Sequence, residues 1–219
     1  MHLDTLQRVL VQGADLGKLS RDGQADLPRL KEGGINCVVF AAWVDPIYAP
    51  YHAAQRAFQL IDGLQKMLEK YPDLIELAQI AADVRRIVAT KKLAALLGIE
   101  GGHAIQTDLA LLRTFHRLGA VCMTLTHANT NEWVDSSTDF RRWGGLSDFG
   151  REVIREMNRI GMIIDVTHTS EETVWDVLDI STKPIMASHS CCAALCNHPR
   201  NLSDDCIYAI AQNGGINRN

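Results

Sequence analysis

The sequence predicts an α/β protein in which helices cover a parallel sheet. Apolar runs typical of buried strands alternate along the chain with segments in helical spacing. The strand-like runs are apolar throughout, which is typical of parallel strands buried on both faces. A (β/α)8 TIM-type barrel broken near its seventh strand fits this pattern. An open doubly wound sheet also fits, although no GxGxxG motif follows the first strand.

The first half of the chain supplies two strand–helix pairs. Residues 35–44 (INCVVFAAWV) are β-branched and aromatic and predict a buried strand. Residues 51–70 place apolar side chains at helical spacing. A second strand is expected at 93–99, and a second helix at 108–118 ends at Gly119, a natural helix stop.

The same alternation continues through the second half. Ser147 and Ser170 are typical N-caps, and Gly161 closes the helix that follows Ser147. A last helix is expected over 201–212. In all we expect about six to seven strands, including a shortened one at His2. The strands predicted in this half are 120–126, 162–166 and 184–188.

Length and composition predict one globular domain over residues 1–219. The chain is 47% hydrophobic, and its 22 basic and 26 acidic residues give a net charge of −4. Proteins that bind nucleic acid through phosphate contacts are more basic, so no nucleic-acid partner is expected. No apolar run reaches the ~20 residues of a transmembrane segment. No signal peptide opens the chain, and six scattered cysteines indicate reduced thiols, so a cytoplasmic location is expected.

Both ends of the sequence look truncated. A polar segment begins at His2 with no strand before it, and the chain stops shortly after the turn at Gly214 and Gly215. A complete domain normally finishes its last element. We therefore expect an incomplete barrel that lacks a few residues in front and more behind.

Four ionisable residues stand at or just after the C-terminal ends of predicted strands. They are Glu100, His127, His168 and His189. The C-terminal ends of the strands form the rim on which barrel enzymes build their active sites. Side chains that lie far apart in the sequence are therefore expected to converge in space.

His2 and Asp4 extend this set. In an extended segment, residues two apart point to the same face, so His-x-Asp can direct an imidazole and a carboxylate at one ion. Nitrogen and oxygen ligands of this kind suit zinc, although imidazole and carboxylate also accept cobalt or manganese. The number of groups exceeds the three protein ligands of one catalytic zinc. Two ions bridged by the Glu100 carboxylate account for the excess.

At the level of motifs, the chain resembles the membrane (renal) dipeptidase family, peptidase family M19. The matching segments occur in the family's order and cover almost the whole chain. They are HLDT at 2–5, DLPRLKEGGIN at 26–36, IEGGHAI at 99–105, MTLTHANT at 123–130, GLSDFGREVIREMNRIGMIIDVTHTS at 145–170, ASHS at 187–190 and HPRNLSDD at 198–205.

The resemblance implies a binuclear zinc peptidase on a (β/α)8 barrel that hydrolyses dipeptides with a zinc-bridging hydroxide. His127 would contact the substrate and stabilise charge on the scissile carbonyl oxygen, and Arg200 would hold the substrate carboxylate. A small dipeptide is the expected partner, and a homodimer is the expected oligomer. The implied ligands are His2 and Asp4 for the first zinc, His168 and His189 for the second, and Glu100 for both.

Two other functions stay open at this point. One is a related binuclear hydrolase that acts on another small amide or lactam. The other is an inactive truncated fragment, because the resemblance places an acidic residue for proton transfer beyond the end of this sequence.

Two further residues are expected to support the site rather than bind metal. His103 would lie beside a ligand, and Asp165 would bond to backbone or to a ligand histidine.

Overall fold

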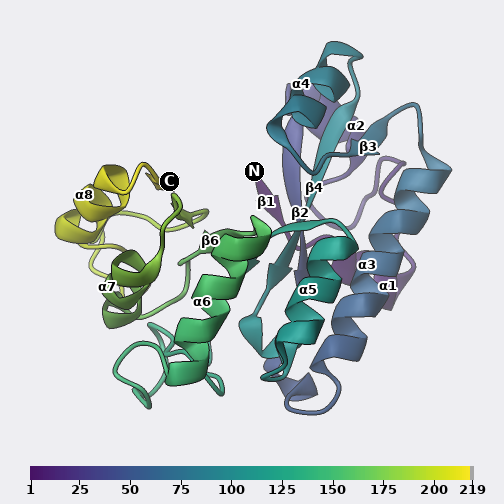
Figure 1. Cartoon of the computed structure of the whole chain (residues 1–219). Coiled ribbons are helices and arrows are strands. Elements are labelled where there is room, and N and C mark those ends of the chain that lie inside the picture. The colour runs from purple at the N-terminus through teal and green to yellow at the C-terminus, as the bar shows by residue number, and fades with distance from the viewer. Residues whose placement is uncertain (218–219) are drawn as a thin grey trace.

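The computed structural model describes residues 1–217 and contains one parallel sheet of eight strands. The strand order is β1-β2-β4-β5-β6-β7-β8. The short strand β3 lies outside this order and pairs with the first residues of β4, whereas β5 pairs with the last residues of β4. The sheet curls and helices cover its outer side (Figure 1), so the predicted fold class, a partial (β/α)8 barrel, is confirmed. The strands are β1 His2–Leu3, β2 Cys37–Trp43, β3 Ile75–Leu77, β4 Leu93–Glu100, β5 Ala120–Thr124, β6 Ile163–Asp165, β7 Met186–Ala187 and β8 Ile216–Asn217.

Local capping chemistry sets where several helices begin. The hydroxyls of Ser147 and Ser170 accept hydrogen bonds from Gly150 N and Thr173 N, so both predicted N-caps are confirmed. Ser203 caps the last helix, which starts later than the sequence pattern predicts. The helices are α1 Leu6–Gln12, α2 Leu27–Glu32, α3 Ala53–Lys70, α4 Ala81–Ala89, α5 Leu109–Arg117, α6 Asp148–Ile160, α7 Glu171–Ile180 and α8 Asp204–Gln212, with 3₁₀ turns η1 Pro46–Tyr48 and η2 Gly102–Ile105.

The hydrophobic core lies between the sheet and the helices packed on it. Phe40 of β2 and Leu97 of β4 are almost fully buried, as are Leu60 of α3 and Phe115 of α5. Burial of each such side chain contributes about 1.5–3 kcal/mol to folding. No helix in residues 1–217 has the length and apolar character needed to cross a membrane.

The strand register places the last residues of neighbouring strands at one level. Trp43 pairs with Glu100, Glu100 with Thr124, and Thr124 with Asp165. Because all these strands are parallel, the segments that follow them leave the sheet at the same edge. This edge carries the polar residues that the sequence places after the strands.

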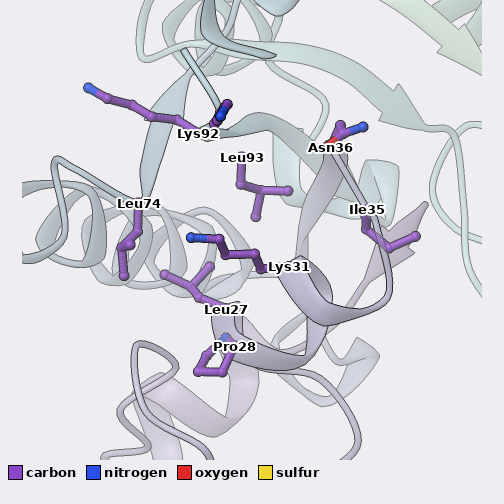
Figure 2. A pocket seen from close by; sticks show the side chains of 9 residues that line it. Leu27, Pro28, Lys31, Ile35, Asn36, Leu74, Lys92 and Leu93 are labelled. Atoms are coloured by element: carbon purple, nitrogen blue, oxygen red, sulfur yellow. The ribbon is translucent and has the colours of Figure 1, made fainter. Parts of the chain in front are cut away.

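The opposite edge of the sheet has a different character. A cavity of about 270 Å³ lies at the N-terminal ends of β2 and β4, beside α2 (Figure 2). Its walls are largely apolar, with three lysines and one asparagine. The lining residues are Leu27, Pro28, Lys31, Ile35, Asn36, Leu74, Lys91, Lys92 and Leu93.

Candidate metal centre

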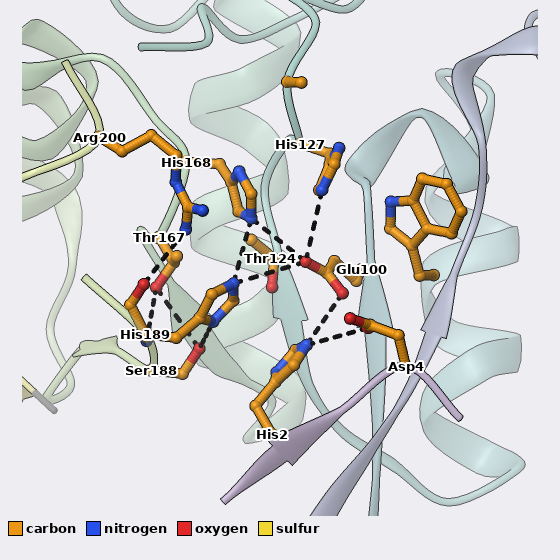
Figure 3. Close-up of polar contacts among 12 residues, drawn as sticks. His2, Asp4, Glu100, Thr124, His127, Thr167, His168, Ser188, His189 and Arg200 are labelled. Carbon is orange, nitrogen blue, oxygen red and sulfur yellow. Dashed lines mark hydrogen bonds and ion pairs between the residues drawn. The ribbon is translucent and has the colours of Figure 1, made fainter. Parts of the chain in front are cut away.

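The Glu100 carboxylate lies at the centre of a group of imidazoles (Figure 3). It ends β4 and is only 2% exposed. Its Oε2 atom lies 2.9 Å from His2 Nε2. Its Oε1 atom faces the other histidines. The distances from Oε1 to their Nε2 atoms are 3.2 Å for His168, 3.6 Å for His189 and 3.9 Å for His127.

The two carboxylate oxygens therefore face two different sets of donors. His2 belongs to β1, and its Nε2 also lies 3.4 Å from Asp4 Oδ1. Asp4 has 58% of its side chain open to solvent and, among residues 1–217, belongs to neither compact group of potential ligand atoms. The potential ligand atoms fall into two compact groups that share Glu100. One contains His2 and His189, and the other contains His127 and His168.

The donor set fits a metal ion on its own chemistry. The Nε2 atoms of His168 and His189 lie 3.1 Å apart, and both face Glu100 Oε1. Two imidazole lone pairs repel each other at this distance unless a proton or a cation lies between them. Buried Nδ1 of His168 has no hydrogen-bond partner among the described residues. Nitrogen and carboxylate oxygen are the ligands that zinc prefers in catalytic sites.

The pKa shifts describe a buried anion surrounded by imidazoles. Burial alone would raise the pKa of Glu100, but hydrogen bonds from the surrounding histidines outweigh it and hold that pKa far below its ordinary value. Burial opposes the charged form of His2, yet its contacts with Asp4 and Glu100 prevail and raise its pKa to about 10. Burial lowers the pKa of His127 to about 4, and the repulsion that a second protonated imidazole would meet from His168 acts in the same direction. The side of the site that holds His2 and the two carboxylates therefore attracts cations. The side that holds His127 favours neutral imidazole.

A model of the family described as membrane dipeptidase (peptidase family M19) matches residues 1–217. The chain belongs to peptidase family M19. It is 43% identical to dipeptidase tcpJ of Claviceps purpurea over 203 residues, covering 89% of this chain and 48% of the relative. It is 36% identical to dipeptidase 3 of Mus musculus, covering 94% and 42%. The M19 chain thus spans about half the length of the curated relatives it matches.

A solved structure gives the same result for the fold. A metallo peptidase from Rhodobacter sphaeroides, liganded with a phosphinate mimic of the dipeptide L-Ala-D-Ala, superposes with a TM-score of 0.89 at 26% identity. The superposition covers 99% of this M19 chain and 71% of the other chain.

Asp165 supports the centre of the M19 chain through Ser188. The buried Asp165 carboxylate accepts hydrogen bonds from Thr167 N and Ser188 N, and also from the Ser188 hydroxyl. Because that hydroxyl gives its proton to Asp165, its oxygen accepts from His189 Nδ1 at 2.8 Å. This arrangement leaves His189 Nε2 with a lone pair directed at the metal centre. The sequence predicts that Asp165 bonds to backbone or to a ligand histidine, and it bonds to backbone. Among residues 1–217 it reaches His189 through Ser188, a residue that the sequence does not single out.

Two glycines let the chain leave β4 close to β5. Gly101 has φ +102°, a conformation that side chains disfavour. A Cβ atom on Gly102 would lie 2.2 Å from Leu125 O, where Gly102 N donates a hydrogen bond to the same carbonyl. The carboxylate of Glu100 is therefore held against the end of the neighbouring strand.

Arg200 and His103 lie beside the cluster without entering it. Arg200 Nη2 donates to His189 O at 3.2 Å, and its buried Nε has no partner among the described residues. The guanidinium therefore lies next to the centre with donor capacity to spare. His103 is buried next to Gly101 and belongs to neither ligand group of residues 1–217. Burial lowers the pKa of His103 to about 4 and keeps it neutral.

Proposed function

We propose that this chain carries the binuclear metal centre of a dipeptidase that hydrolyses the peptide bond of a dipeptide. The observation that carries the proposal is that the two oxygens of Glu100 face different histidines. Oε2 faces His2, and Oε1 faces His168 and His189. A carboxylate directed at two separate donor sets is suited to bridge two ions. The family of the chain and the dipeptide mimic bound to its structural relative support the same reaction.

In this proposal the ions are two zinc ions. His2 and Asp4 would hold one ion, His168 and His189 would hold the other, and Glu100 would contact both. This division follows the Glu100 oxygen that each histidine faces, and not the two compact groups, which place His189 with His2. The mixture of imidazole nitrogen and carboxylate oxygen supports zinc. Ser188 and Asp165 keep His189 in the tautomer that presents Nε2 to the ion.

The protein groups around the ions bind and orient the substrate. Arg200 holds the C-terminal carboxylate of the dipeptide, because its buried Nε and its fork of donors suit bidentate recognition. His127 contacts the scissile carbonyl oxygen and stabilises charge that develops there. With its pKa lowered to about 4, neutral His127 does not repel a cation beside it. When bound, a zinc pair lowers the pKa of water and polarises a carbonyl group.

The test is hydrolysis of L-Ala-D-Ala and L-Ala-L-Ala by the purified chain loaded with zinc, with release of alanine measured against a chelated sample. An N-acyl amide and a β-lactam in the same assay test the alternative of another amide or lactam hydrolase. We expect zinc-dependent turnover of a dipeptide, loss of turnover in His189→Ala, and no change in His52→Ala. His52 is exposed and makes no side-chain cap bond. Zinc binding at two equivalents without hydrolysis of either dipeptide would refute the proposal.

A further inference from the structure

Ser136 joins the backbones of two histidines of the metal centre. It lies in the segment 125–147, between β5 and α6, and its side chain is completely buried. Its hydroxyl donates to the carbonyl oxygen of His127 at 2.7 Å. The same hydroxyl lies 3.3 Å from the carbonyl oxygen of His168, which belongs to the segment after β6. One proton is thus shared between two carbonyls that lie 41 residues apart in the chain.

His168 needs such support because its backbone is strained. Its φ is +73°, in the left-handed region that residues with a side chain rarely occupy. Ser137 N donates to the His168 carbonyl at 2.8 Å, and Ser136 pairs with Thr169 as an antiparallel bridge. Strained conformations persist only where the surroundings hold them, and they gather at functional sites. The segment around Ser136 therefore holds His168 in the conformation that directs Nε2 at Glu100.

The two histidine rings depend on this link for their relative position. The ring centroids of His127 and His168 lie 4.2 Å apart, and they reach the site from different strands. In the proposed function one ring faces the substrate and the other binds a metal ion. A displacement of one backbone with respect to the other would change the distance between the substrate carbonyl and the ions.

We propose that Ser136 is a positioning residue that fixes the substrate-contacting His127 relative to the metal-binding His168. The proposal rests on the proposed function for its effect on catalysis. The structural part of the proposal is that one hydroxyl contacts both backbones, and this part applies to any reaction at this centre. Removal of the hydroxyl would leave the fold intact and loosen the geometry of the two histidines.

The test compares Ser136→Ala with Ser137→Ala. Ser137 is the neighbouring serine in the same segment, its Oγ has no hydrogen-bond partner among residues 1–217, and its N–H contact with His168 survives the substitution. We expect kcat for a dipeptide to fall about tenfold to a hundredfold in Ser136→Ala, because a misplacement of about 1 Å at a reacting centre has effects of this size. KM should change less than threefold, and Ser137→Ala should resemble the unmodified chain in both constants.

A double-mutant cycle separates positioning from a general loss of structure. If Ser136 acts through His127, the effect of Ser136→Ala on kcat should shrink to less than about threefold in a His127→Ala background. Equal effects of Ser136→Ala in both backgrounds would contradict the proposal, as would a kcat within twofold of Ser137→Ala.

A second measurement does not depend on turnover. Zinc competition with a chromophoric chelator should show a weaker second equivalent in Ser136→Ala, while the thermal midpoint of the metal-free chain falls by no more than about 4 °C, the loss expected for one buried hydrogen bond. A chain that binds two zinc ions but hydrolyses no dipeptide would refute the proposed function and leave this measurement to decide on Ser136. Unchanged affinity for both equivalents would then overturn the positioning role.

Discussion

The two ends of the parallel sheet differ in what they bury. At the C-terminal ends of the strands, Glu100 buries a carboxylate among four imidazoles, two of which lie within 3.2 Å of it. At the N-terminal ends, the cavity beside α2 is lined by leucines such as Leu27 and Leu93, and Lys31 lies among them (Figure 2). One end concentrates charge, and the other concentrates apolar surface.

The strand β4 connects both ends, because it runs from Leu93 to Glu100. Burial of a carboxylate costs free energy unless partners compensate it, whereas burial of leucine stabilises the fold. The two ends of β4 therefore contribute to different properties of the protein. The start of the strand contributes stability, and its last residue contributes chemistry, as expected of a barrel strand.

Glu100→Gln should have the largest effect. Glutamine keeps the size of the side chain but cannot offer a charged oxygen to each of two ions, so we expect zinc affinity to fall by more than about a hundredfold at both positions. This exceeds the range for residues that only contact a metal ligand. Glu76→Gln on β3 is the matched control, because its carboxylate pairs with Arg86 far from the centre. The measurement is zinc content by elemental analysis after dialysis. Two zinc ions retained per chain in Glu100→Gln would contradict the bridging role.

Leu93→Ala should have the largest effect at the other end of β4. Leu93 is 8% exposed and packs in the main core cluster, so its truncation should lower the free energy of unfolding by about 3 kcal/mol. Urea unfolding of the metal-free chain measures this loss. Zinc stoichiometry should stay unchanged, because the substitution lies seven residues before Glu100. Loss of zinc binding in a folded Leu93→Ala chain would contradict the idea that the start of β4 contributes stability alone.

His103 gives the C-terminal end a pH-dependent stability. Its folded pKa of about 4 lies below its ordinary value of 6.5, because burial penalises the charged form. The unfolded chain therefore binds more protons between these values, and stability falls as the pH drops through that window. From pH 7.5 to pH 5 this group accounts for about 2 kcal/mol.

The measurement is urea unfolding of the metal-free chain at both pH values. His103→Gln cannot be protonated, so its stability should fall by about 2 kcal/mol less than that of the unmodified chain over the same pH interval. The difference between the two chains isolates His103 from the other histidines. Parallel losses in both chains would show that His103 is not buried in its neutral form.

The sequence predicts those parts of the fold in which local signals are long or chemically distinct. The runs that form β2, β4 and β5 are apolar over at least four residues, and Ser147 and Ser170 mark helix starts by their capping chemistry. Short elements such as α1 and β3 escape prediction because seven or three residues carry too little periodicity. They are held by packing on elements that are distant in sequence.

In the metal centre, too, the sequence predicts what local signals determine and misses what tertiary packing determines. The positions of Glu100 and His168 after apolar strands predict that they meet, because parallel strands end at one edge, and the structure brings them together. The sequence does not reveal how donors are divided between the two oxygens of Glu100. It also gives no sign of Ser136 or Ser188, since serine is common in loops and only the tertiary structure brings their hydroxyls to the histidines.

Lys92→Met should have the smallest effect and sharpens the contrast at the N-terminal end. Lys92 Nζ lies 3.4 Å from Glu76 Oε2 in a partly exposed ion pair, beside the apolar cavity. Exposed pairs of this kind contribute about 0–1 kcal/mol, and methionine keeps most of the apolar stem that lines the cavity. We expect a change in the free energy of unfolding of less than about 1 kcal/mol and no change in zinc binding or turnover. A large loss of stability would mean that charge, rather than apolar packing, maintains this end of the sheet.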